Sequence, residues 1–392
     1  MAPNPVYLDH AATTPVRAEV LEAMLPYLGA GAFGNPSSAH RFGRAARAGL
    51  EEARRKVAAA VGAEPNQVVF TSGGTEADNL AVIGGALAAR AAGRRMRAAV
   101  CATEHKAVLA AAHAVARLGG EEEVLPVDGN GVVRLDALDA ALAAGPAVVS
   151  VMWVNNEVGT LQPVEEIGRR CQAAGAMFHT DAVQAFGQVP VSVGAMPATM
   201  LTISGHKIGA PKGIGALVVR SRAAVEAIIH GGSQQFGLRP GTENVAGAVA
   251  LGRAAELAAA EQGEKAARLR RLRDALAGRI RAALPDAVWI AEEGPRAPHV
   301  LSMAVPGADA EAMLMHLDLQ GVAASAGSAC MTGAAEPSHV LTAMGVPRPL
   351  ALGTIRFSLG RETTEADVER AAEVFPAVVA KVRALAGVLG RA

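Results

Sequence analysis

Short apolar runs, several rich in valine, alternate along the first half of the chain with longer segments of helical periodicity. Each run is followed by turn residues, and the strand candidates are residues 68–70, 99–101, 148–154, 177–179 and 201–203. This alternation predicts an α/β fold with a mainly parallel central sheet that is covered by helices. Ligands of such sheets bind beyond the carboxyl ends of the strands, so the polar residues that follow these runs are candidates for one shared pocket.

The second half of the chain begins with a long, charged, alanine-rich helical pattern from about Thr242 to Ala283, which Pro285 ends. We interpret this helix as the connector to a smaller α/β domain. The strand candidates of that domain are residues 300–303 and 354–357, and its helices follow Asp309 and Thr364. Because 392 residues exceed the size at which one core keeps growing, we expect a large domain over residues 15–255 and a small domain over residues 1–14 and 256–392.

The segment 323–335 consists almost entirely of Ala, Ser and Gly, which is too little apolar side chain to offset the cost of ordering it. We expect a mobile loop here, with Cys330 on it. The other two cysteines, Cys101 and Cys171, fall in apolar strand and helix patterns and are expected in the core. Three distant cysteines predict neither a disulfide framework nor a paired-cysteine zinc site, and no metal site is assigned.

The balance of charge narrows the class of partner. Lys and Arg together number 37, as do Asp and Glu, so the overall field offers no basic surface for nucleic acid or an anionic membrane, and a small ligand is expected. No apolar run is long enough to span a bilayer, and the amino terminus has no basic and apolar leader pattern. These features predict a soluble protein of the cytoplasm.

Lys207 and Asp181 are the residues from which the chemistry can be argued. The amine of a lysine can condense with the aldehyde of pyridoxal phosphate, and a carboxylate against the ring nitrogen keeps that nitrogen protonated. Both residues follow strand candidates, and the turn after Lys207 can hold its amine inside a cleft. Lys212 is the main competitor, and an ordinary solvated lysine is the other interpretation of Lys207.

A phosphate site is predicted where Gly74 and Thr75 open a helix after the strand candidate 68–70. Glycines let the backbone approach an anion, and the free amides at the helix start point towards it. A glycine turn with a threonine cap explains the same residues equally well.

Four further side chains are candidates for the same pocket. His105 follows a strand candidate and could stack on a ring and shuttle protons, or could satisfy backbone groups at a helix start. Gln184 follows Asp181 by three residues and could bind a ring hydroxyl. Arg356 could bind a substrate carboxylate in a bidentate manner, with a surface salt bridge as the alternative. Cys330 could act as a thiolate that attacks a sulfur atom.

With these residues assembled, the chain resembles the cysteine desulfurases of the NifS/IscS type, in the class V aminotransferase group of pyridoxal-phosphate fold type I. The resemblance extends nearly end to end, and its order and spacing make it very specific. It rests on the segments 7–15, 33–38, 71–79, 103–106, 154–159, 179–184, 204–213, 239–244, 325–330 and 355–361.

The resemblance implies a role for each candidate. Lys207 would hold the cofactor, Asp181 and Gln184 would pair with its ring nitrogen and hydroxyl, and His105 would stack on the ring. The phosphate would be bound by Thr75, Ser204 and His206, and across a homodimer interface by Thr242. Asn156 and Arg356 would bind the substrate carboxylate, with Asn35 nearby.

The implied reaction converts L-cysteine to L-alanine. Lys207 would remove the α-proton, and Cys330 would take the sulfur as a persulfide and deliver it to an acceptor such as an iron–sulfur scaffold protein. Two alternatives share the cofactor apparatus, an aminotransferase of the same class and a selenocysteine lyase. A third is a catalytically silent partner of a desulfurase, against which Lys207 and Asp181 argue.

One segment departs from the resemblance. Residues 231–237 have Ser233, Gln235 and Phe236 where relatives usually show Gly, Glu and Arg, which removes an expected charge pair. This departure bears on the local loop and the dimer contacts. The acceptor of the sulfur is not indicated by the sequence.

Overall fold

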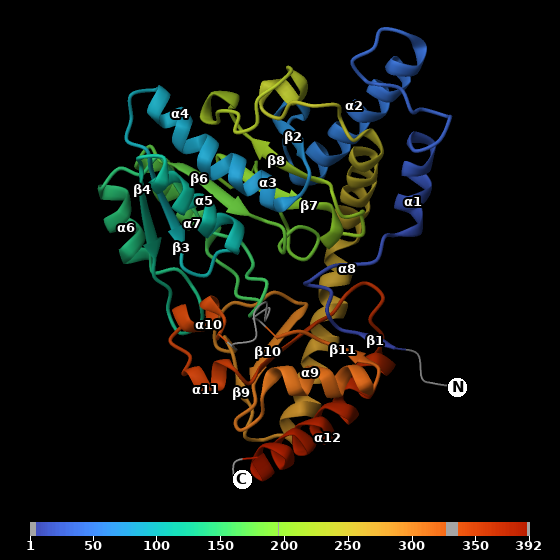
Figure 1. The fold of residues 1–392 in the computed structure, drawn as a ribbon, viewed down its shortest axis with the longest axis vertical. Helices are drawn as coiled ribbons and strands as arrows, with labels where there is room; N and C mark the ends of the chain where they lie inside the picture. The colour runs from blue at the N-terminus through green and yellow to red at the C-terminus, as the bar shows by residue number, and fades with distance from the viewer. Residues whose placement is uncertain (1–4, 195, 327–335, 390–392) are drawn as a thin grey trace.

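The computed structural model describes residues 5–194, 196–326 and 336–389. Its main sheet has seven strands in the order β2-β8-β7-β6-β5-β3-β4 (Figure 1). β8 runs antiparallel to both of its neighbours, and every other pair in this sheet is parallel, which confirms the predicted α/β fold. The strands are β2 (Val68–Thr71), β3 (Arg97–Cys101), β4 (Glu121–Leu125), β5 (Val148–Ser150), β6 (Met177–Asp181), β7 (Met200–Ser204) and β8 (Gly215–Val219).

Helices cover both faces of this sheet because successive side chains of its strands point to opposite faces and both are apolar. Val149 and Leu201 pack in one core with α2, α6, α7 and the first half of α8. Val148 and Met200 pack on the other side, towards the helix that begins at Gly74. The covering helices are α2 (Arg41–Val61), α3 (Gly74–Asn79), the π-helix η3 (Leu80–Gly84), α4 (Gly85–Ala91), α5 (Lys106–Arg117), α6 (Leu135–Ala143) and α7 (Val164–Ala173).

A smaller layer of strands and helices lies beside the main sheet and is drawn in orange and red in Figure 1, except for its N-terminal strand β1, which is blue. β10 lies between β9 and β12 and is antiparallel to both, and β1 pairs in parallel with β11. Their apolar faces form a second core with α9, α12 and the second half of α8. The elements are β1 (Val6–Tyr7), β9 (Val288–Trp289), β10 (Val300–Ala304), α9 (Ala310–Leu319), β11 (Val322–Ala323), α10 (His339–Ala343), α11 (Arg348–Ala351), β12 (Thr354–Ser358) and α12 (Glu365–Leu389).

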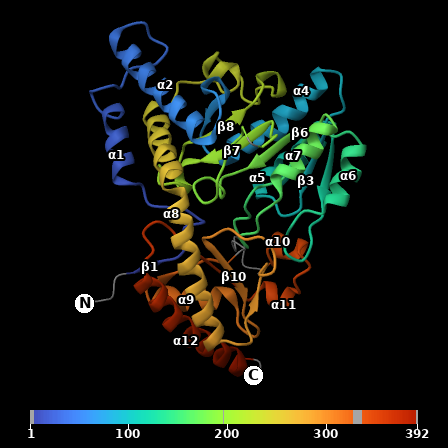
Figure 2. The ribbon, with the colours of Figure 1, turned by 180° about the vertical axis from the view of Figure 1, so that it is seen from behind.

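The long helix α8 (Val245–Ala283) extends along both parts, as Figures 1 and 2 show from opposite sides. The side chain of Asn244 caps its first turn by accepting from the backbone N–H of Gly247. α1 (Ala18–Met24) and α2 pack against its first half, and α12 packs against its second half. The structure therefore confirms the predicted long helix, while the domain boundaries at residues 15 and 255 stay a prediction.

Short helical turns complete the described chain: η1 (Leu25–Tyr27), η2 (Pro65–Gln67), η4 (Gly205–Lys207), η5 (Arg222–Ala224) and η6 (Gln234–Gly237). Within the described ranges, no helix is both long enough and apolar enough to cross a membrane.

Two expectations need correction. The strand predicted over 148–154 ends at Ser150, although the backbone N–H groups of Val151 and Trp153 still donate to carbonyl oxygens of β6. The predicted loop does not begin at Ala323, which pairs with Tyr7 in β1, and Ser325 is joined to Arg356 by two backbone hydrogen bonds of 3.1 and 2.7 Å. Residues 327–335, with Cys330 among them, lie outside the described residues.

Candidate active site

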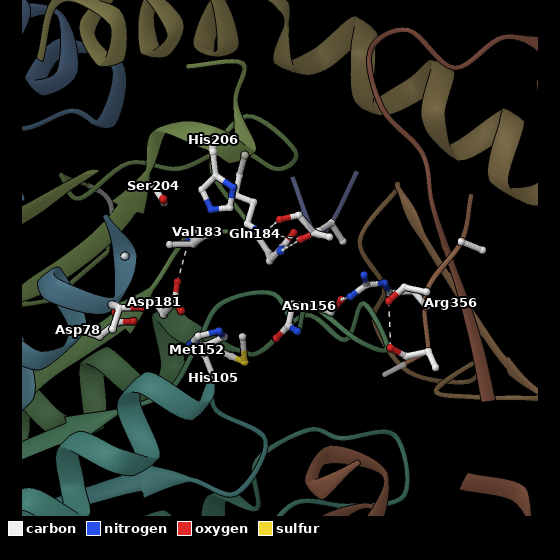
Figure 3. A pocket seen from close by; sticks show the side chains of 18 of the residues that line it. Asp78, His105, Met152, Asn156, Asp181, Val183, Gln184, Ser204, His206 and Arg356 are labelled. Carbon is white, nitrogen blue, oxygen red and sulfur yellow. Dashed lines mark hydrogen bonds between the residues drawn. The ribbon is translucent and has the colours of Figure 1, made fainter. Parts of the chain in front are cut away.

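A cavity of about 610 Å³ opens at the carboxyl ends of β6 and β7, next to the smaller part of the chain. Asp181 ends β6 and Ser204 ends β7, so the sheet itself delivers both side chains to the cavity. Figure 3 shows Asp181 towards one end, Arg356 towards the other, and His105 and Asn156 between them. The predicted residues that line the cavity are Gly74, Thr75, His105, Asn156, Asp181, Gln184, Ser204, His206, Lys207 and Arg356.

Lys207 enters the cavity from the short turn η4, directly after β7. Its amine donates to the carbonyl oxygens of Ala11 and Ala12, both at 2.6 Å. Burial, assisted by the positive charge of Arg356, lowers the pKa of Lys207 from 10.5 to about 8. An amine with this pKa is partly neutral near neutral pH and can act as a nucleophile or a base. The competitor Lys212 is exposed and lies outside the cavity lining.

Asp181 is held rigidly at the floor of the cavity. Its Oδ1 accepts from the backbone N–H of Val183 at 2.8 Å. Burial raises the pKa of Asp181, while the positive charges of His105 and Lys207 oppose that rise. Gln184 is oriented by its side-chain amide, which donates to the carbonyl oxygen of Ala11 at 2.8 Å.

Asp78 also lines the cavity, beside Asp181 (Figure 3), although no sequence pattern selected it. It is 1% exposed, and its Oδ1 has no hydrogen-bond partner among the described residues. Burial and the neighbouring Asp181 raise the pKa of Asp78 well above its usual value. The environments of these two carboxyls thus favour protonation of Asp78 over a second buried charge.

A chain of hydrogen bonds lies beneath this pair. His179 is fully buried, and its ring nitrogens lie 2.9 Å from Ser150 Oγ and 3.0 Å from Thr202 Oγ1. Ser150 in turn donates to Glu104 at 3.1 Å. Burial lowers the pKa of His179 to about 3, so the ring is neutral at neutral pH. These contacts fix the strands that present Asp181.

The predicted phosphate-binding part of the cavity lies where Gly73 precedes α3. Gly73 has φ of 157° and ψ of −175°, a conformation that is essentially restricted to glycine. Gly74 and Thr75 then begin the helix at the cavity. His206 also lines the cavity; its Nδ1 lies 3.2 Å from Thr13 Oγ1, and burial lowers its pKa to about 4. It is therefore a neutral hydrogen-bonding group.

Arg356 is 5% exposed and points into the cavity from β12. Its Nη2 donates to Asp9 Oδ1 at 2.6 Å, and its Nη1 donates to the carbonyl oxygen of Asn156 at 2.6 Å. Arg356 thus makes a salt bridge, but the surface position considered as the alternative is wrong, because Arg356 is buried and lines the cavity.

His105 occupies the start of α5, where its Nδ1 accepts from the backbone N–H of Ala107 at 3.2 Å. This is the capping contact that was considered as the alternative interpretation. The same side chain also lines the cavity, so the two interpretations do not exclude one another. Burial lowers the pKa of His105.

Three residues that were predicted for the site are not among the described residues that line the cavity. Asn35 is exposed, and its Oδ1 accepts from the backbone N–H of Ser37. Thr242 is exposed on the turn before α8, and its predicted contact is with a second subunit. Cys330 lies outside the described residues. Their roles stay predictions.

The other two cysteines are buried, as expected. Burial raises the pKa of the Cys101 and Cys171 thiols to about 12. Neither is suited to supply a thiolate.

In the loop of residues 231–237, which departs from the resemblance, the neutral side chain of Gln235 makes hydrogen bonds where a charge pair was expected. Gln235 is buried, and its Oε1 accepts from Arg54 Nη1 at 3.1 Å and from the backbone N–H of Phe70 at 3.0 Å. Its amide donates to Glu243 at 3.3 Å. The guanidinium of Arg54 also lies over the ring of Phe236, 4.9 Å from its centroid.

The aminotransferase class-V family model matches residues 6–371. Among curated relatives, the chain is 47% identical to a cysteine desulfurase of Cereibacter sphaeroides, with 97% of each chain covered. It is 43% identical to the cysteine desulfurase IscS of Dictyoglomus turgidum, with 97% of this chain and 96% of the relative covered.

Solved structures of similar fold point to the same family. A NifS-like protein superposes with a TM-score of 0.87 at 34% identity, over 97% of this chain and 99% of the other. The NifS-like protein from Rickettsia africae ESF-5 superposes with a TM-score of 0.84 at 31% identity, over 96% and 99%. The chain therefore belongs to the aminotransferase class-V family of pyridoxal-phosphate enzymes. Within that family it groups with the cysteine desulfurases of the NifS/IscS type.

Proposed function

We propose that this chain transfers the sulfur of L-cysteine to Cys330 as a persulfide and leaves L-alanine. The observation that supports this proposal is the joint placement of Lys207, Asp181 and Arg356 around one cavity. The lining also includes Ser325, five residues before Cys330 in the sequence. The names of the relatives agree with this activity.

The donor set fits pyridoxal phosphate, the cofactor of the family. A lysine amine of lowered pKa, a buried carboxyl and a glycine-led helix start face the same cavity. Lys207 would bind the cofactor covalently, Asp181 would hold a proton on its ring nitrogen, and Gly74, Thr75, Ser204 and His206 would bind its phosphate. The bound cofactor supplies a ring that accepts electrons from the Cα of the substrate.

Lys207 is the proposed base that removes the α-proton. Burial and Arg356 disfavour the ammonium form, so part of the amine is neutral near neutral pH and has a lone pair available for the proton. The carbonyl oxygens of Ala11 and Ala12 accept from this amine, so they keep it at the cavity wall. His105, which also lines the cavity, is the residue proposed to stack on the ring and to exchange protons.

Arg356 and Asn156 are the proposed binding groups for the α-carboxylate of the substrate. Both line the cavity, and the guanidinium is buried, which strengthens its interaction with a carboxylate. Asn35 is an additional candidate if a second subunit completes the site.

The sulfur transfer balances without an external oxidant. The Cys330 thiolate attacks the substrate sulfur, the Cβ–S bond breaks with its electron pair left on carbon, and a proton completes the methyl group of alanine. Cys330 retains one added sulfur atom, ready for a nucleophilic acceptor. Cys101 and Cys171 are buried with raised pKa values, which supports Cys330 as the nucleophile.

The proposal extends to the assembly. We infer a homodimer in which Thr242 of each chain completes the phosphate site of the other, and a cytoplasmic sulfur-acceptor protein such as an iron–sulfur scaffold. The exposure of Thr242 leaves it accessible to a second chain.

Mass spectrometry of the digested protein after incubation with L-cysteine tests the proposal. We expect a gain of one sulfur atom on the peptide that contains Cys330, together with one equivalent of L-alanine. The peptides of Cys101 and Cys171 serve as internal controls and gain none. A Cys330→Ser variant that still releases sulfide from L-cysteine at the wild-type rate would falsify the persulfide route.

A further inference from the structure

We propose that Asp9 is the positioning residue that sets the guanidinium of Arg356 for the α-carboxylate of the amino-acid substrate. This inference rests on the proposed function, in which Arg356 binds that carboxylate, and it adds a residue to which neither the sequence patterns nor the comparisons give a role.

Some N–H groups of the Arg356 guanidinium are already hydrogen-bonded within the protein, and others are free to bind a ligand. Asp9 accepts one N–H of Nη2 and the carbonyl oxygen of Asn156 accepts one N–H of Nη1, each at 2.6 Å. Nε is closed off from solvent and has no partner among the described residues. Since each Nη carries two N–H groups, one N–H on Nη1 and one on Nη2 remain for a ligand. Two neighbouring N–H groups of this kind match the two oxygens of a carboxylate.

Of the two groups that accept from Arg356, the Asp9 carboxylate is the one that carries charge. Arg356 is 5% exposed, and a buried cation without a counter-charge is strongly disfavoured. The carbonyl oxygen of Asn156 is a neutral acceptor and cannot supply that compensation. Removal of the Asp9 carboxylate would therefore free Nη2 and favour a different side-chain position, away from the geometry that two-point binding requires.

Asp9 is itself held firmly. It belongs to the N-terminal strap, which we define as residues 7–12. The backbone N–H of His10 donates to the carbonyl oxygen of Ser358 at 3.1 Å, and the N–H of Ser358 donates to the carbonyl oxygen of Leu8 at 2.7 Å. The Ser358 hydroxyl accepts from the N–H of Ala11 at 2.9 Å. Because Ser358 and Arg356 belong to the same strand, β12, the strap and the arginine form one unit.

The strap also links the two ends of the site. Asp9 contacts Arg356, and two residues later the carbonyl oxygen of Ala11 accepts from the amine of Lys207 and from Gln184. A carboxylate held by Arg356 is thereby placed in a fixed relation to the proposed base. This arrangement explains why a small substrate with one carboxylate is oriented by a single arginine.

The test compares L-alanine with ethylamine, which is the same molecule without the carboxylate. Each is titrated into the holoenzyme, and binding is followed by the absorbance of the bound cofactor. Asp9→Ala removes the acceptor and Asp9→Asn keeps a neutral acceptor in its place. Arg356→Ala removes the guanidinium, and Asp318→Asn is the matched control, since Asp318 is an exposed carboxylate of α9.

We expect Asp9→Ala to weaken L-alanine binding by about ten-fold, the effect of losing an aligned charge-assisted contact, and to leave ethylamine binding unchanged. Asp9→Asn keeps an acceptor but removes the counter-charge, so it should also weaken L-alanine binding, whereas Asp318→Asn should retain all of the affinity. With L-cysteine the same loss should appear in KM while kcat changes little.

The results that would contradict the proposal separate the role of Asp9 from the role of Arg356. Equal weakening of L-alanine and ethylamine by Asp9→Ala, or no weakening of either while Arg356→Ala weakens L-alanine, would overturn the role of Asp9. A wild-type enzyme that binds both ligands equally well, with no effect of Arg356→Ala, would instead remove Arg356 from the proposed function.

Discussion

The carbonyl oxygen of Ala11 lies 2.6 Å from the amine of Lys207, although the two residues are 196 positions apart in the sequence. The amide of Gln184 donates to the same oxygen at 2.8 Å. One backbone group of the N-terminal strap thus accepts from two side chains on the segments that directly follow β6 and β7. The strap therefore fixes where the reactive amine rests, and a strap residue has consequences for chemistry that its position near the terminus does not suggest.

Replacement of Lys207 should remove covalent cofactor binding completely. Lys207→Ala protein is expected to lack the absorbance of covalently bound pyridoxal phosphate and to release no alanine from cysteine, because the cavity then has no amine. Lys212→Ala is the matched control and should keep both properties, since Lys212 is exposed outside the cavity. Absorbance spectra of the two purified variants distinguish the residues, and a colourless Lys212→Ala protein would reverse their roles.

The attachment of pyridoxal phosphate to the apoprotein should depend on pH as the pKa of Lys207 dictates. The neutral amine is the nucleophile, and its pKa is lowered from 10.5 to about 8, so the rate should rise up to about pH 8 and level off above it. Stopped-flow absorbance across this range measures the rate. A rate that continues to rise towards pH 10.5 would show an ordinary solvated lysine.

Much of the fold could be predicted because its central strands are short, apolar and separated by helices. The runs at 68–70 and 201–203 became β2 and β7 with one or two residues added. β4 escaped prediction because its sequence, Glu-Glu-Glu-Val-Leu, is mostly charged, and an edge strand can be charged without burying charge. β8 escaped because Gly215–Val219 follows a glycine-rich turn and pairs antiparallel, outside the expected alternation.

The site residues that could be predicted from the sequence are those whose side chains have a specific chemistry. Lys207 and Asp181 could be selected from their side chains, and the cavity brings both together. Asp9 and Asp78 could not be selected in this way, because an aspartate near the terminus or in a helical segment resembles a solvated residue. Their burial and contacts depend on pairings across the fold, such as Asp9 with Arg356.

His179 should make the protein sensitive to acid. Its pKa is lowered to about 3 in the folded chain, whereas an unfolded histidine titrates near 6.5. Between these values the unfolded state binds more protons, so the free energy of unfolding should fall as pH decreases from 6.5 towards 3. Denaturant midpoints measured across this window should fall less steeply for His179→Asn than for the wild type. His113→Asn, at an exposed position, should keep the wild-type slope, and equal slopes for all three proteins would contradict the prediction.

Gln235 is expected to stabilise the turn η6 through neutral hydrogen bonds in the place of a charge pair. Its backbone has φ of 47°, a left-handed conformation that costs free energy in a residue other than glycine and persists where surrounding contacts impose it. Gln235→Ala would leave the Phe70 N–H without its acceptor and remove one partner of Arg54 in a buried setting. The free energy of unfolding should therefore decrease by about 2 kcal/mol, measured as a shift of the denaturant midpoint. Ser233→Ala, at an exposed position in the same loop, should shift the midpoint little. If both variants unfolded at the wild-type midpoint, the contacts of Gln235 would not account for the conformation of this loop, and Phe236 stacking on Arg54 and Arg222 would have to sustain it.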